Sequence, residues 1–134
     1  MAGAPGPPPS LDALFVRDGM VVARHARGAA SLDEMEAVLV AFDALLERTG
    51  AGLLLLDVRR VVETVPAVQE RLWEWMAGHP RLLRVAALME SREDGRNMRT
   101  DGAERGVRLR VFPEEPAART WLLGLGELSG VGSS

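Results

Sequence analysis

Residues 52–61 read GLLLLDVRRV, and this stretch decides the fold class. Its four consecutive leucines make both faces of a strand apolar, which is typical of a central parallel strand covered by helices on either side. A glycine before the leucines and charged residues after them limit the run to the length of a strand. The stretch therefore predicts a buried strand in the middle of an α/β sheet.

Regular elements are predicted on both sides of this strand. Before it, Asp18-Gly19 lies between two apolar runs and predicts a β-hairpin, and Ser31 with Glu34 forms a capping box for a helix that ends at Gly50. After it, the pattern predicts a helix over 66–78, a strand over 82–89, a polar helix over 91–106 weakened by two glycines, a strand over 107–111 and a last helix from residue 116. The order predicts an α/β fold: a mixed, largely parallel four- to five-stranded sheet with an N-terminal β-hairpin and helices on its faces.

Length and composition set the domain organisation and exclude several function classes. The 134 residues are expected to form one domain over 13–124, after a disordered, proline-rich lead-in at 1–12 and before a flexible tail at 125–134. The absence of cysteine excludes disulfides, cysteine nucleophiles and the usual zinc sites, and it fits a cytoplasmic location. A net charge of -3 argues against a general nucleic-acid binder, and no apolar run approaches the ~20 residues of a membrane span.

Three stretches resemble a known family. They are the strand at Leu53–Val61, the strand VAALME at Val85–Glu90 and the closing unit RVFPEEPAARTWL at Arg110–Leu122. With the order of elements, they resemble the STAS/SpoIIAA-like family, bacterial domains related in fold to anti-sigma-factor antagonists and to a SEC14-related, lipid-carrying branch. The resemblance implies a domain that binds a partner protein or a small ligand and has neither catalytic machinery nor a cofactor.

The segment after the central strand departs from the family pattern. In anti-sigma-factor antagonists an Asp-Ser pair begins the next helix, and its serine is phosphorylated. The corresponding residues 61–67 read VVETVPA and contain no serine. Thr64 is the nearest hydroxyl, and no aspartate precedes it, so we expect a module without the usual phosphoserine switch.

The same segment supplies most of the candidate binding residues. Asp57, Arg59 and Arg60 follow the central strand, and ligands of open α/β sheets bind beyond the carboxyl ends of the strands. The alternative for Asp57 is that it only satisfies N–H groups of the following loop. Thr64 is either a modification site or, as its position before Val65-Pro66 favours, the N-cap of the next helix.

Trp73 is the candidate contact for a protein partner or for self-association. Trp73 and Trp75 are two positions apart and cannot share one helix face, and Trp75 fits the apolar stripe. Trp73 is therefore expected to be partly exposed, as tryptophans of interfaces are in the free protein, with packing under a loop as the alternative. His25 and His79 do not have the spacing of metal ligands, so no metal site is expected.

Three functions are compatible with these residues. A non-enzymatic STAS-like regulatory or protein-interaction module comes first, and a small apolar-ligand or lipid carrier of the SpoIIAA/SEC14-like type is the alternative. An enzyme that uses Asp57 with an arginine clamp ranks last, because no nucleophile–base arrangement is recognisable.

Overall fold

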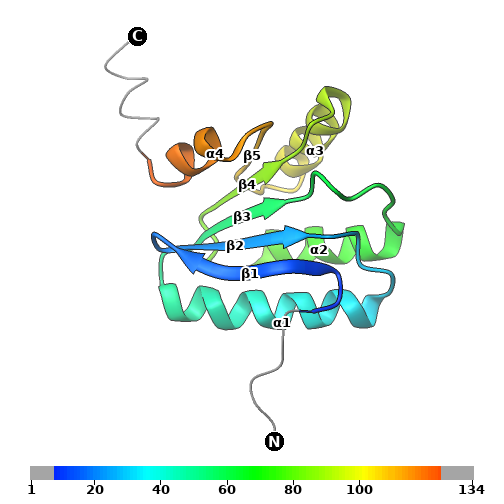
Figure 1. The fold of residues 1–134 in the computed structure, drawn as a ribbon, viewed down its shortest axis with the longest axis horizontal. Coiled ribbons are helices and arrows are strands. Elements are labelled where there is room, and N and C mark those ends of the chain that lie inside the picture. The colour runs from blue at the N-terminus through cyan, green and yellow to red at the C-terminus, as the bar shows by residue number, and fades with distance from the viewer. Residues whose placement is uncertain (1–7, 125–134) are drawn as a thin grey trace, which may run out of the picture.

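A five-stranded sheet forms the centre of the computed structural model, which describes residues 8–124 (Figure 1). The strands are β1 (Leu11–Arg17), β2 (Met20–His25), β3 (Leu53–Asp57), β4 (Arg84–Leu88) and β5 (Leu109–Phe112). The helices are α1 (Leu32–Thr49), α2 (Pro66–Gly78), α3 (Arg92–Glu104) and α4 (Glu115–Leu122). The strand order is β1-β2-β3-β4-β5, antiparallel between β1 and β2 and parallel elsewhere. The predicted fold class is confirmed.

The opening hairpin is built around Asp18 and Gly19. Both have positive φ, 53° and 81°, as the twist-matched turn between two antiparallel strands requires. Strand β1 begins at Leu11, which is buried and pairs with His25, so the first strand starts two residues before the expected domain boundary at 13. The rest of the expected lead-in, residues 1–7, and the expected tail, residues 125–134, lie outside the described residues.

Helices α1, α2 and α3 lie on one face of the sheet, and α4 lies on the other. Each of the first three connects a strand to its parallel neighbour, and each step moves in the same direction along the sheet. Because such crossovers are right-handed, three steps in one direction place all three helices on the same face. Helix α4 follows the last strand, is free of this constraint and packs back against β4.

Alternation along the strands divides the core between these two faces. Leu54 and Leu56 of β3 pack with α1 and α2, whereas Leu55 packs with α4. All three leucines are fully buried, so the predicted burial of the central strand on both faces is confirmed.

Helix α3 forms as predicted despite its two glycines. A Cβ at Gly95 would lie 3.1 Å from Cγ1 of Val111 in β5, and a Cβ at Gly102 would lie 3.6 Å from the ring of Trp73. The glycines therefore let α3 approach the sheet and α2 closely, which offsets their low helix propensity. Among the helices of residues 8–124, none is long and apolar enough to cross a membrane.

Candidate functional site

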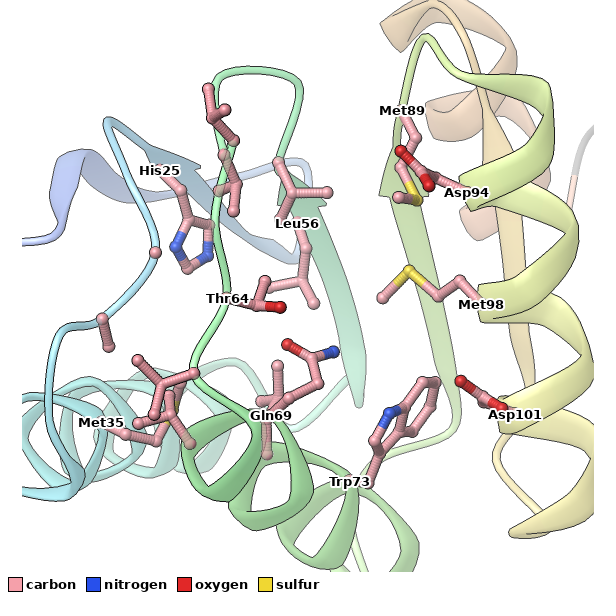
Figure 2. A pocket seen from close by; sticks show the side chains of 18 of the residues that line it. His25, Met35, Leu56, Thr64, Gln69, Trp73, Met89, Asp94, Met98 and Asp101 are labelled. Atoms are coloured by element: carbon pink, nitrogen blue, oxygen red, sulfur yellow. The ribbon is translucent and has the colours of Figure 1, made fainter.

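A pocket of about 320 Å³ opens at the carboxyl edge of the sheet, on the face that α1, α2 and α3 cover (Figure 2). This volume is at the lower end of the range for small-molecule sites. Most of the lining is apolar: Gly28, Ala29, Met35, Leu56, Val58, Val61, Val62, Val65, Val68, Leu72, Trp73, Met89 and Met98. The polar lining residues are His25, Thr64, Gln69, Asp94, Asn97 and Asp101.

The floor and one wall of the pocket follow from the fold. His25 ends β2, Leu56 lies near the end of β3 and Met89 follows β4, so three neighbouring strands end at the floor. Asp94, Met98 and Asp101 recur at helical spacing along α3 and form a wall opposite the histidine. Figure 2 shows this arrangement, with Asp94, Met98 and Asp101 directed from α3 toward the pocket.

His25 is the buried polar residue of the floor. The residue is 7% exposed, and its Nε2 has no hydrogen-bond partner within the described part of the chain. Burial lowers the pKa of His25 to about 4, because the charged imidazolium is poorly solvated there, and the nearby charge of Asp57 opposes this only partly. The imidazole is therefore neutral at pH 7 and presents one unused hydrogen-bonding nitrogen.

The loop over residues 58–65 forms the outer wall. It approaches the β2–α1 connection so closely that a Cβ at Gly28 would lie 2.6 Å from the carbonyl oxygen of Glu63. Val62 of this loop lines the pocket, yet it is 91% exposed. The loop therefore faces the pocket on one side and solvent on the other.

Thr64 lies on this loop and lines the pocket, but it does not cap α2. The predicted cap is wrong, because Val65 is the N-cap residue and the helix has no hydrogen bond from its first N–H groups to a capping side chain. Pro66 takes the first helical position, where its missing N–H costs nothing, and this places the threonine one residue too early to cap. Its hydroxyl lies beside the pocket instead (Figure 2).

Trp73 is buried, so the expectation of partial exposure is wrong. Only 2% of its surface is exposed, and its ring fills the space between α2 and Gly102 of α3. The guanidinium of Arg105 lies 5.4 Å from the ring centroid and forms an ion pair with Glu70 at 2.7 Å. Trp75, on the other side of α2, donates from Nε1 to Asp43 at 3.0 Å and packs 5.7 Å from Phe42 of α1. Both tryptophans are covered because α2 has a helix on each side.

Asp57 faces α4, away from the pocket. Its carboxylate accepts hydrogen bonds from Nε and Nη2 of Arg59 at 3.0 and 2.8 Å, from the Arg59 backbone N–H at 3.2 Å, and from Arg24 at 3.3 Å. Arg24 also forms an ion pair with Glu115 at 2.8 Å. Burial raises the pKa of Asp57, but the hydrogen bonds from Arg59 and the two positive charges outweigh it and lower the pKa overall.

Arg60 pairs with Asp12 of β1, and both side chains are largely exposed. Of the five predicted binding residues, Thr64 and Trp73 line the pocket, whereas Asp57, Arg59 and Arg60 do not. Asp57 does satisfy the backbone of the loop that follows it, through the N–H of Arg59. The structure thus separates the predicted residues into a pocket group and a charged group.

Comparison with known proteins gives a fold likeness. No family model matches the sequence, and no curated protein matches it. Among solved structures, the chain is similar to an uncharacterised DUF3478-family protein with a SpoIIAA-like fold from Shewanella loihica PV-4. The TM-score is 0.63, and the match covers 82% of this chain and 90% of that one. This chain has a SpoIIAA-like fold. At 13% identity the likeness shows the fold alone, and it does not distinguish a SEC14-related branch.

The SpoIIAA-like domain thus places residues in its pocket that the sequence pattern did not single out. His25 is the most buried polar residue of the lining, and Asp94 and Asp101 bring its negative charges. The histidine had a detectable signal, since it follows Val21 and Ala23 in alternation and shares their buried face. Within residues 8–124, no group of three or more histidine, aspartate or glutamate side chains is placed to hold a metal ion.

Proposed function

We propose that this SpoIIAA-like domain binds a small, mainly apolar molecule in the pocket between α2 and α3, without catalysis. The observation that carries the proposal is an apolar cavity whose lining includes the buried His25, with an Nε2 atom that has no hydrogen-bond partner within residues 8–124. An unsatisfied buried polar atom costs about 1–3 kcal/mol. A ligand with one hydroxyl or carbonyl group would satisfy it, and the apolar body of the ligand would fill the cavity.

The absence of catalysis is part of the same proposal. Thr64 carries the one hydroxyl group of the pocket lining, and within the described residues it makes no hydrogen bond to His25. Asp57, the base or nucleophile of the enzymatic alternative, faces α4 and is held by Arg59 and Arg24. Neither pair provides an activated nucleophile next to a base.

Methionine methyl NMR with two closely related probes tests the proposal. The probes are para-xylene and para-methylbenzyl alcohol, which differ by one hydroxyl group. Met35, Met89 and Met98 line the pocket, so their methyl signals are expected to shift when a probe binds. Met20 is buried on the α4 face, so its methyl signal is expected to stay in place.

The role of the histidine is read from the difference between the probes. Wild-type protein is expected to bind the alcohol about tenfold more tightly than xylene, because a site built around a polar atom discriminates against a ligand that leaves it unpaired. His25→Phe is expected to lose this preference, while His79→Phe, outside the pocket, is expected to keep it. If neither probe shifts the pocket methionines up to its solubility limit, the proposal is wrong.

A regulatory or protein-interaction module is the second candidate, and one observation favours it. Val62 is 91% exposed on the loop that also lines the pocket. A protein that contacts this loop would therefore bind differently when a ligand in the pocket displaces the loop. Sedimentation velocity over a wide concentration range tests the self-association form of this candidate. Val62→Ser is expected to weaken association, and Val40→Ser, at an exposed position of α1, is the matched control. A strictly monomeric wild-type protein would remove this form of the candidate.

A further inference from the structure

We infer that the ligand of this pocket carries a positive charge, as an amine on an apolar, ring-sized body. The inference rests on the proposed ligand-binding function and adds the chemical class of the ligand. The observation behind it is the charge of the lining, which contains two carboxylates and no arginine.

The two carboxylates are Asp94 and Asp101 of α3. They are seven residues apart, so they lie on the same side of the helix two turns from each other. Figure 2 shows both side chains on the pocket wall, with Met98 between them. Within residues 8–124 neither carboxylate has an ion-pair partner within 4.0 Å. The wall therefore presents negative charge that the protein itself does not neutralise.

Two arginines near the pocket, Arg105 and Arg59, have acidic partners of their own. Arg105, which lies over the ring of Trp73, pairs with Glu70 at 2.7 Å. Arg59, at the end of β3, is held by Asp57 at 2.8 Å on the opposite face of the sheet. An anionic ligand would thus enter a site of the same sign, whose lining contains no arginine.

Helix N-termini at this edge of the sheet act in the opposite direction, because they attract anions. The N-terminus of α3 is already capped by Ser91, whose hydroxyl accepts from the Asp94 N–H at 3.1 Å, and its first turn contains Glu93 and Asp94. The N-terminus of α2 has no side-chain cap, but a helix N-terminus corresponds to only about half a positive elementary charge. Two full carboxylates outweigh it, so the lining favours a cation.

His25 supplies a second, independent reason to expect a ligand here. It lies across the pocket from α3 (Figure 2), is more than nine-tenths buried, and has an Nε2 atom with no hydrogen-bond partner among the residues that the structure describes. Since its imidazole is neutral, it does not repel a cation. A ligand of this class would place its ring among the methionines, its amine toward Asp94 and Asp101, and the hydroxyl or carbonyl group of the proposed function toward His25.

Three probes that share a para-tolyl ring but differ in charge test the inference. They are para-methylbenzylamine, para-methylbenzyl alcohol and para-toluate, each titrated while the methyl signals of Met35, Met89 and Met98 are followed. The amine is expected to bind about tenfold more tightly than the alcohol, the size of effect that two partly exposed carboxylates give together. The toluate is expected to bind more weakly than either, and added salt is expected to reduce the advantage of the amine.

Variants that remove the two carboxylates of α3 test whether these cause the preference for the amine. In Asp94→Asn/Asp101→Asn the amine and the alcohol are expected to bind equally, whereas Glu104→Gln, on the same helix but outside the lining, is expected to keep the wild-type order. Amine binding that is no tighter than alcohol binding, or toluate binding that is the tightest, would overturn the inference and leave the proposed function standing. If no probe binds, the proposed function fails as well. The salt dependence of the wild-type protein decides the matter if the double variant does not fold.

Discussion

Arg24 and His25 are neighbours in the chain, yet they lie in opposite environments. Arg24 points to the α4 face and joins Asp57, Arg59 and Glu115 in a cluster where each charge has a partner. His25 points to the other face and lines a cavity, and its buried Nε2 has no hydrogen-bond partner within residues 8–124. The strand alternation that separates them by one residue makes one face a closed electrostatic unit and the other a site with an unmet hydrogen bond. Charged residues at a strand end are thus a poor guide to the face that contains the pocket.

The largest expected effect is a loss of stability in acid, caused by His25 on the pocket face. Its pKa is about 4 in the folded chain and 6.5 in the unfolded one, so between these pH values the unfolded chain binds more protons and the free energy of unfolding falls as pH falls. The difference corresponds to roughly 3 kcal/mol. Urea unfolding at a series of pH values measures it, and His25→Phe is expected to lack this part of the fall. A variant with the same pH dependence as the wild type would show that the histidine is not the cause.

Removing Asp57 is expected to have the next largest effect. Asp57→Ala leaves Arg24 and Arg59, each about one third exposed, without their shared carboxylate, and a loss of about 2 kcal/mol in unfolding free energy is expected. Asp12→Ala, which breaks the exposed pair with Arg60, is the matched control and is expected to cost less than about 1 kcal/mol.

The same Asp57→Ala variant also tests whether the charged cluster on the α4 face affects ligand binding in the pocket on the other face. Binding of para-methylbenzyl alcohol is expected to be unchanged in it, because the carboxylate lies across the sheet from the pocket. A parallel loss of stability and of probe binding would mean that the two faces are coupled.

Gly28→Ala is expected to have the smallest effect on stability and a clear effect on the pocket. The new Cβ would lie 2.6 Å from the carbonyl oxygen of Glu63, so the loop over 58–65 must move outward, at a cost of about 1 kcal/mol. A displaced outer wall is expected to weaken binding of the alcohol probe in the methionine NMR titration. Gly78→Ala is the control, since a Cβ there meets nothing within 4 Å. Unchanged affinity in Gly28→Ala would separate the loop from the site.

Local patterns were sufficient to predict the elements of the fold. The turn at Asp18-Gly19, the cap at Ser31 and the apolar run after Gly52 each depend on neighbouring residues alone. The polar helix α3 was also predicted, although the reason for its glycines, contact with Val111 and Trp73, involves partners from other elements.

The site depended on long-range packing, which local patterns do not report. Trp73 looked exposed on a helix taken alone, and α3 covers it. Thr64 looked like a cap until Pro66 placed the helix start one residue later. Asp57 was correctly placed at the carboxyl edge of the sheet, but the face to which it points follows from the handedness of three crossovers. The same rule, applied to the alternation from Val21 to His25, would have placed the histidine beneath the helices.

The strand order has a consequence for how the chain folds. Each strand of β1 to β5 pairs only with the strands that come directly before and after it in the sequence. The hairpin closes over a two-residue turn, whereas the parallel pairings join residues 24 to 33 positions apart, and such non-local pairing is associated with slower folding. We expect the hairpin to form first and later strands to join in the order in which a ribosome delivers them, so that each incomplete sheet has a single growing edge.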